Sequence, residues 1–216
     1  MRSTAPPAIW VGWILHQGGP YSWGDYVGFA YLGIALAVLL VFIAPMVLFN
    51  QLLHSRLHAR WKTAHLCLAL IRRLNVLGGM SQDQLDLEKA KLLAGEGKPD
   101  PALEVWNAGA SRRDEIEHQT GLVQIHDAAG NAEEAIAGQR RVLALQPSEL
   151  VRVDLAISIA RHVGDAGEAE ALIAGIDPRE LSELALAGYQ FARGLIAHQR
   201  DQAAQALQHF TQAIEQ

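Results

Sequence analysis

Cysteine is almost missing from this sequence, since Cys67 is the one cysteine among 216 residues. A lone cysteine excludes an intramolecular disulfide and any zinc centre built on several thiolates. The chain also lacks a glycine-rich phosphate loop, a His-Glu-x-x-His pair and a Gly-x-Ser-x-Gly nucleophile turn. These absences favour a protein that has no catalytic residues, no metal and no cofactor.

Acidic residues are scarce in the first 78 positions, where Asp25 stands against six Arg and Lys residues and the net charge is +5. The remaining residues carry a net charge of −10. A nucleic-acid-binding surface needs clustered positive charge to neutralise phosphates, so we expect no nucleic-acid partner for the acidic part. The asymmetry predicts that the two parts of the chain face different surroundings.

A stretch without any charged residue runs from Tyr26 to Phe49. About 20 helical residues cross the hydrocarbon core of a bilayer, so the stretch predicts one transmembrane helix over 26–49. Residues 1–25 then form an extracytoplasmic or interfacial segment. The tryptophans at 10, 13 and 23 before the span and at 61 after it fit the aromatic belts of the two interfaces.

The charges beside this run predict its orientation. Arg2 precedes the span, whereas five cations follow it: Arg56, Arg60, Lys62, Arg72 and Arg73. Positive residues stay on the cytoplasmic side, so we expect a single-pass protein of the inner (plasma) membrane with its N-terminus outside. Residues 50–78 are predicted to form a basic amphipathic juxtamembrane helix. That helix either lies against anionic lipid headgroups through the five cations or packs as a stalk on the following domain.

A repeated frame fills residues 79–216. Gly97, Gly130 and Gly164 are each followed five residues later by an alanine, and Asp201 replaces the glycine in a fourth copy. The alanines at 102, 135, 169 and 206 are separated by 33, 34 and 37 residues. Glycine suits a tight turn between two helices, and a small alanine lets the second helix approach the first. The frame predicts about four helical hairpins.

Helix-capping pairs mark the expected starts of several helices. A Ser, Asn or Asp followed three residues later by Gln or Glu has the spacing of a capping box. Four such pairs are Ser81 with Gln84, Asn131 with Glu134, Asp165 with Glu168, and Asp177 with Glu180. Pro178 would then occupy the first helical position of the last of these.

The period and frame resemble the tetratricopeptide repeat (TPR) family, whose units are helix-turn-helix hairpins of about 34 residues. Gln139 stands where that family usually has an aromatic residue, and a related hairpin repeat of slightly longer period is the alternative. With the membrane span, the layout resembles bacterial envelope-assembly adaptors. The expected fold is all-α, with one transmembrane helix followed by an α-solenoid.

The resemblance implies a groove, lined by the first helix of each hairpin, that binds a peptide of a partner protein. Carried over position by position, the groove-facing candidates are Lys91, Gln124, Asp127, Asp154, Ser158, Arg161, His162, Phe191 and His198. In the last repeat, Leu207, Phe210 and Ile214 have no following helix to cover them all. We expect part of this surface to dock another copy of the chain or a subunit of a membrane complex.

The leading hypothesis is a non-enzymatic adaptor that displays its repeats at the cytoplasmic face of the membrane and binds a protein or peptide. The alternative is a periplasm-facing assembly factor, of the type that serves cytochrome c maturation or outer-membrane chaperoning. A third hypothesis is an enzyme that uses His54 and His58 or the pre-membrane residues His16, Tyr21 and Asp25. Nothing orders these side chains into a nucleophile and base, and two histidines without a third ligand predict no metal site.

Overall fold

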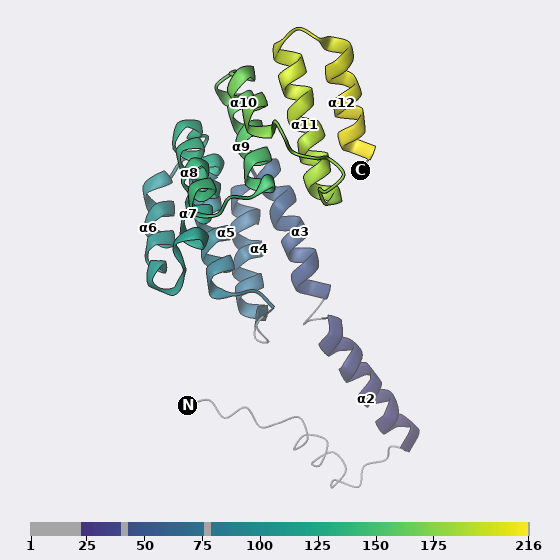
Figure 1. The fold of residues 1–216 in the computed structure, drawn as a ribbon. Helices are drawn as coiled ribbons and strands as arrows, with labels where there is room; N and C mark the ends of the chain where they lie inside the picture. The colour runs from purple at the N-terminus through teal and green to yellow at the C-terminus, as the bar shows by residue number, and fades with distance from the viewer. Residues whose placement is uncertain (1–22, 40–42, 76–78, 216) are drawn as a thin grey trace.

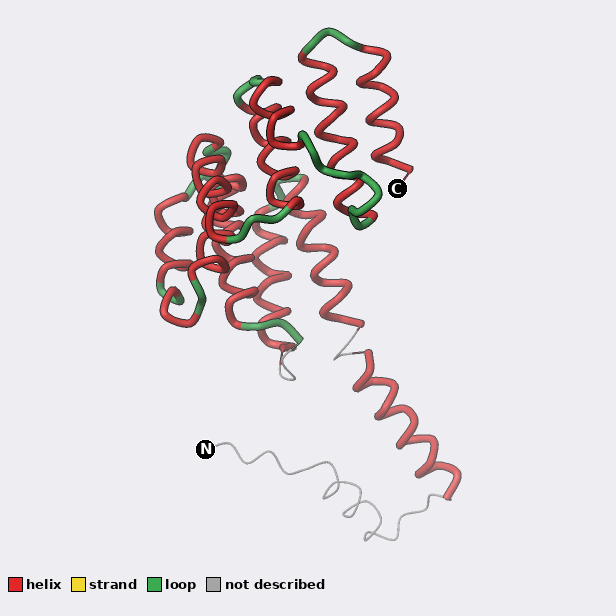
Figure 2. The backbone as a smooth tube through the Cα atoms, in the orientation of Figure 1, coloured by secondary structure: helices red, strands yellow, loops and turns green. Residues whose placement is uncertain are grey.

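The chain is helical in the part that the computed structural model describes, which comprises residues 23–39, 43–75 and 79–215. Figures 1 and 2 show helices and connecting loops, with no strand among these residues. The α-helices are α2 (Trp23–Val38), α3 (Ala44–Leu57), α4 (Trp61–Leu74), α5 (Gln82–Gly95), α6 (Pro99–Asn107), α7 (Glu115–Ala129), α8 (Ala132–Leu145), α9 (Glu149–His162), α10 (Ala166–Ile173), α11 (Glu183–Gln199) and α12 (Ala203–Glu215). A short 3₁₀ turn, η3 (Ala110–Arg112), lies between α6 and α7. The described residues thus confirm the all-α prediction.

From α3 onward the described helices pair as five consecutive hairpins, α3–α4, α5–α6, α7–α8, α9–α10 and α11–α12, numbered 1 to 5 below. The second helix of each of the first four hairpins also contacts the first helix of the next hairpin. In addition, α5 packs on α7 and α9 packs on α11. The hairpins therefore stack into one array, which is the arrangement of an α-solenoid (Figure 1).

A similar turn joins the two helices of every hairpin. Its central residue has a positive φ, at Gly97 (78°), Gly130 (76°) and Gly164 (78°) and also at the non-glycine residues Ala59 (51°) and Asp201 (59°). Five residues after each of them stands a buried alanine: Ala64, Ala102, Ala135, Ala169 and Ala206. The alanine places the second helix against the first, as the repeat frame predicts.

Hairpin 1 corrects the prediction of one amphipathic helix over 50–78. The chain reverses at Ala59, where the N–H of Arg60 donates to the carbonyl of Ser55 at 2.8 Å. The N–H of Lys98 donates to the carbonyl of Leu93 in the same relative position, at 2.9 Å, so both turns have the helix-ending geometry of a Schellman motif. The array consequently begins one hairpin earlier than the four repeats that the sequence predicts.

The predicted caps are only partly confirmed. Ser81 and Gln84 form the full capping box at the start of α5, and the side chain of Asp165 accepts from the N–H groups of Gly167 and Glu168. Asn131 makes no side-chain cap bond. The prediction at Asp177 is wrong, because its side chain accepts from the N–H of Arg179 within a turn and α11 begins only after Ser182, whose hydroxyl caps it.

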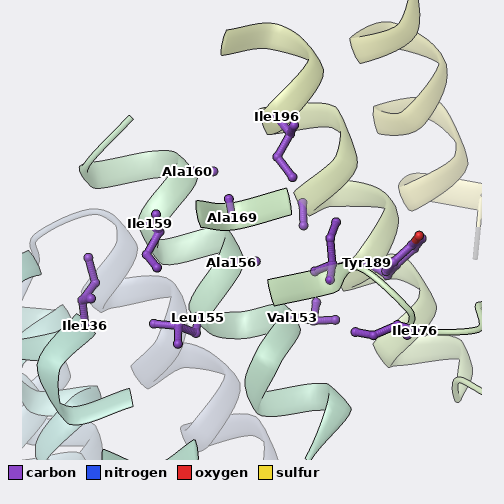
Figure 3. Packing of buried hydrophobic residues seen from close by; sticks show 12 residues of the cluster. Ile136, Val153, Leu155, Ala156, Ile159, Ala160, Ala169, Ile176, Tyr189 and Ile196 are labelled. Atoms are coloured by element: carbon purple, nitrogen blue, oxygen red, sulfur yellow. The ribbon is translucent and has the colours of Figure 1, made fainter. Parts of the chain in front are cut away.

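Three clusters of buried apolar side chains hold the array together, and the largest joins hairpins 3, 4 and 5. Figure 3 shows this cluster, in which Ile136 of α8, Leu155 of α9 and Ile196 of α11 are buried with their neighbours. The alanines at 156, 169 and 192 are fully buried in it. Such small residues let the helices approach closely, and the larger side chains between them exclude water from the core.

The predicted membrane span falls on two helices. Its first part lies in α2, residues 40–42 are outside the described residues, and its last part belongs to α3, which begins at Ala44. Among the described helices, none combines the length and the apolar character that crossing a membrane requires. Further along α3, Leu52 is fully buried against α4 and α5, so this helix belongs to the array.

Candidate functional site

The nine predicted groove residues all lie on the first helices of hairpins 2 to 5. Lys91 is on α5, Gln124 and Asp127 are on α7, Asp154, Ser158, Arg161 and His162 are on α9, and Phe191 and His198 are on α11. The structure brings three of them into two clefts, and the other six line neither. Gln124 and Ser158 are partly buried, whereas Asp127, Arg161, His162 and His198 are exposed.

The larger cleft, named the C-terminal cleft, has a volume of about 740 Å³. Its floor is α11, and α9 and α12 form its two walls. The lining residues are Leu150 and Asp154 of α9, Leu184, Ala187, Gly188 and Phe191 of α11, and Phe210, Ala213 and Ile214 of α12. Asp154 and Phe191 are thus brought together, and a cleft of this size lies in the range of ordinary ligand sites.

Close packing between glycine and aromatic residues shapes this cleft. A Cβ at Gly194 of α11 would lie 2.5 Å from Cδ1 of Phe210, so the absence of a side chain lets the ring settle on α11. There the ring packs beside Phe191, with 5.6 Å between the ring centroids. The guanidinium carbon of Arg161 lies 5.8 Å from the centre of the Phe191 ring. The two phenylalanines therefore form a fixed apolar surface at one side of the cleft.

The rim of the C-terminal cleft exposes large aliphatic side chains. Leu184 is 79% exposed, Ile214 is 85% exposed and Leu150 is 44% exposed. The sequence predicts that Leu207, Phe210 and Ile214 of the last repeat are not all covered. In the structure Leu207 is 68% exposed and Ile214 is also exposed, whereas Phe210 packs against Phe191. Sequence reasoning missed Leu150 and Leu184, because an apolar residue at helical spacing resembles a core residue. The available signal was the surface of the last repeat that the sequence predicts to be partly uncovered.

Among the described residues, Asp154 is the one acidic residue that lines the C-terminal cleft. The residue is exposed overall, yet the apolar side chains around its carboxyl group remove water from it and raise its pKa. Within the part of the chain that the structure describes, no cation pairs with this carboxylate, although Arg161 lies seven residues away on the same helix. The cleft therefore presents an apolar surface with a single unpaired negative group.

The smaller cleft, named the N-terminal cleft, contains the predicted residue Lys91 and has a volume of about 360 Å³. Its other lining residues are Leu53, Arg56, Leu57, Trp61, Gly95 and Ala128. Both cations are held by the buried Glu88, whose two oxygens lie 3.0 Å from Nη1 of Arg56 and 2.7 Å from Nζ of Lys91. One carboxylate thus joins α3 to α5 and offsets part of the positive charge of this cleft.

The five predicted membrane-surface cations have different surroundings. Arg56 pairs with Glu88, and Arg72 pairs with Asp86 at 3.4 Å. Arg60, Lys62 and Arg73 are exposed and form no ion pair among the described residues. Two of the five cations therefore have a structural role within the array in addition to any contact with lipid.

The residues of the enzyme hypothesis do not form a site in the described part of the chain. His54 lies in the last turn of α3 and His58 directly follows the helix, with 4.3 Å between their ring centroids. No group of three His, Cys, Asp or Glu residues suited to a metal ion exists within the described ranges 23–39, 43–75 and 79–215. His16 and Tyr21 lie outside the described residues.

Comparison with known proteins gives only distant matches. No protein-family model matches the chain, and no curated protein matches it. Two solved structures match, one titled "MamA MSR-1 C2" and the other a point mutant of MamA, each with 18% sequence identity over 80% of this chain. They are covered over 96% and 97% of their lengths, with TM-scores of 0.42 and 0.40 respectively. Values this low assign neither a family nor a function to the chain.

Proposed function

We propose that this protein is a membrane-anchored, non-catalytic scaffold that binds partner proteins through its TPR-like array at the cytoplasmic face of the inner membrane. The observation that carries the proposal is the C-terminal cleft. Its rim exposes Leu184 and Ile214 to water by 79% and 85%, and its floor and walls come from three helices of a stacked array. Contiguous exposed apolar surface of this kind marks sites of protein association.

The apolar character of α2 supports the membrane anchor. Its side chains from Val27 onward are exposed in the isolated chain, including the large residues Val27, Phe29, Tyr31, Leu32, Ile34, Leu36 and Val38. A helix that is apolar on all sides is stable only when another apolar phase surrounds it, and the uncharged run to Phe49 extends this character. A bilayer supplies that phase.

With the proposed anchor, the topology of hairpin 1 favours two of the predicted cations as neighbours of the bilayer. Since α3 and α4 are antiparallel, Arg72 and Arg73 at the end of α4 lie near Ala44, where α3 begins after the anchor. Arg60 and Lys62 lie at the opposite end, about 20 Å away along a 14-residue helix. Arg73, which is exposed and without an ion pair among the described residues, is therefore the best candidate for lipid contact.

Extraction and labelling test the anchor and its orientation. The full chain should remain with membranes in alkaline carbonate, and a chain that starts at Ala44 should be released. For orientation, Ala204→Cys places a thiol at an exposed position of α12, while the native Cys67 is buried and silent to an impermeant maleimide. Labelling only after permeabilisation supports the cytoplasmic face. Labelling of intact cells would instead support the periplasm-facing alternative.

Site-specific photocrosslinking tests the interaction function. A photoreactive phenylalanine analogue at Leu184, in the cleft, should give a discrete crosslinked product in native membranes. The matched control is the analogue at Arg141, an exposed residue of the second helix α8 that lies outside both clefts. Equal crosslinking at the two positions, or none at Leu184, would contradict a binding role for the C-terminal cleft.

A further inference from the structure

We propose that the C-terminal cleft binds an amphipathic α-helix of a partner protein, and that this helix carries one Lys or Arg within its apolar face to pair with Asp154. The inference rests on the proposed scaffold function and specifies the chemistry of the partner. Three properties of the cleft lead to it: the secondary structure of its walls, the composition of its lining, and the charge that it leaves unpaired.

The walls of the cleft select a helix over an extended peptide. An extended peptide needs partners for its own N–H and C=O groups, which a sheet edge normally provides. Here the floor and both walls are helices whose backbone groups bond within the helix, and Asp154 is the only charged side chain among the described lining residues. A helix satisfies its own backbone bonds, so it enters this apolar surface without leaving polar groups unpaired.

The lining fits the apolar face of a short helix. On α11 the lining residues run from Leu184 to Phe191, two helical turns or about 10 Å. Phe210 and Ile214 of α12 lie beside this stretch, because α11 and α12 are the two antiparallel helices of one hairpin. About two turns of a partner helix would cover this length, with side chains at the spacing i, i+3 or i+4, and i+7. The exposed Leu184 and Ile214 would become buried on binding.

The negative charge in the cleft indicates that the partner helix carries a positive charge. The carboxylate of Asp154 has no cation partner among the described residues, and burial alone accounts for the direction in which its pKa is moved. Arg161, seven residues along the same helix, forms no ion pair with it in the described structure. A carboxylate in partly desolvated surroundings gains from a charge-assisted hydrogen bond, and residues 79–216, with net charge −10, attract a cationic partner.

The apolar helices of this chain do not supply that cation. Neither α2 nor α12 contains a Lys or Arg residue, so a second copy that docked through either helix would leave Asp154 unpaired. The apolar face of α4, which does carry basic residues, is already buried in hairpin 1. A separate cationic partner therefore fits the cleft better than self-association does.

Binding of a designed pair of peptides to the full chain in detergent micelles tests the proposal. The probes are two dye-labelled, 14-residue helical peptides with a leucine face, one with a central Lys and one with Gln at that position. Fluorescence anisotropy should give a dissociation constant roughly tenfold lower for the Lys peptide. Asp154→Asn should remove this preference and leave the Gln peptide unaffected. Equal affinities, or a preference that survives Asp154→Asn, would overturn the proposed pairing.

Two further variants locate the binding surface. Leu184→Ser and Ile214→Ser should each weaken both peptides, whereas Val163→Ser, at a 60% exposed residue that does not line the cleft, should weaken neither. Light scattering on the same samples tests whether a second copy of the chain occupies the cleft instead. A dimer that Ile214→Ser dissociates would show this and would overturn the proposal of a partner helix. The Leu184 crosslink tests the scaffold function and does not depend on the charge of the partner. A crosslink without a preference for the Lys peptide would therefore reject the pairing with Asp154 and leave the scaffold function standing.

Discussion

Gly194 of α11 lies directly against the ring of Phe210 of α12, where an added Cβ would come 2.5 Å from both Cδ1 and Cε1. We expect Gly194→Ala to destabilise the chain by about 1–3 kcal/mol, because a packed aromatic ring cannot yield without moving α12. Urea unfolding followed by circular dichroism measures the loss. The double variant with Phe210→Leu should recover part of it, and additive losses would show that the two residues are not in contact.

The same glycine affects the C-terminal cleft, since Phe210 and Phe191 line it together. Displacement of the Phe210 ring by Gly194→Ala should therefore also weaken binding of the helical peptides. Recovery of stability and recovery of binding in the double variant are separate readouts of one contact. A variant that loses stability but keeps full affinity would place the binding surface elsewhere.

The two non-glycine turns store backbone strain that glycine would release. Ala59 and Asp201 have φ values of 51° and 59°, a region that costs an L-residue roughly 1–2 kcal/mol. We expect Ala59→Gly to raise the thermal unfolding midpoint. Asp201→Gly should raise it less, because Asp tolerates this conformation better. The reverse change Gly130→Ala, at φ 76° in open space, should lower the midpoint by strain alone. A lower midpoint for Ala59→Gly would contradict this interpretation of the turn.

The strain at Ala59 also explains why the sequence predicts four hairpins and not the first. The repeat frame is recognisable by its glycines and by Asp201, and alanine at a turn gives no such signal. The second cue, Ala64 five residues later, is present but stands inside a basic stretch that matches an amphipathic helix. Tertiary packing of α3 on α4 decides the turn, and neither local propensity nor charge patterning reports it.

Only part of the candidate site is predictable from the sequence. The repeat frame places Asp154 and Phe191 on first helices, and the structure brings both into one cleft. Leu184 could not be identified, because its exposure depends on the turn that follows α10 and on the late start of α11 after Ser182. The capping pattern at Asp177 predicts that this helix starts near residue 178. In the structure, residues 177–182 form a turn instead, in which Asp177 accepts from the N–H of Arg179.

Glu96 should contribute stability that depends on pH. Its oxygens lie 2.8 Å from Nζ of Lys98 and 2.7 Å from Nε2 of His65, and these partners, Lys98 first, lower its pKa from the ordinary value of 4.5. A lowered pKa stabilises the fold above the unfolded value, and this gain is lost as the pH falls through the folded pKa. Glu96→Gln should therefore unfold at lower urea concentration at about pH 6, with the difference from wild type shrinking below pH 4.5.

The control for this pH dependence is Glu104→Gln on α6, where the carboxylate is exposed and contacts no cation among the described residues. That variant should follow the wild-type urea midpoint at every pH. A Glu96→Gln difference that stays constant from about pH 6 to pH 3 would mean that the loss comes from packing and not from the charge of the carboxylate.

Arg112 and Arg113 offer a matched test of exposed against buried ion pairs. Both contact Asp83 and Asp86 of α5, but the side chain of Arg113 is fully buried and that of Arg112 is 46% exposed. Arg113 also donates to the carbonyl of Trp106 at 2.6 Å and lies 3.4 Å from the centre of the Trp106 ring. It therefore ties the loop before α7 to both helices of hairpin 2.

Removal of Arg113 should cost far more than removal of Arg112. Arg113→Met leaves the partly buried carboxylate of Asp83 without its closest cation, which lies 2.7 Å away, and we expect a loss of about 3–5 kcal/mol. Arg112→Met removes a solvent-screened pair and should cost about 1 kcal/mol or less. Urea midpoints of the two variants at neutral pH give the comparison. Similar losses would mean that neither the burial of Arg113 nor its contacts with Trp106 strengthen its pairs with the shared aspartates.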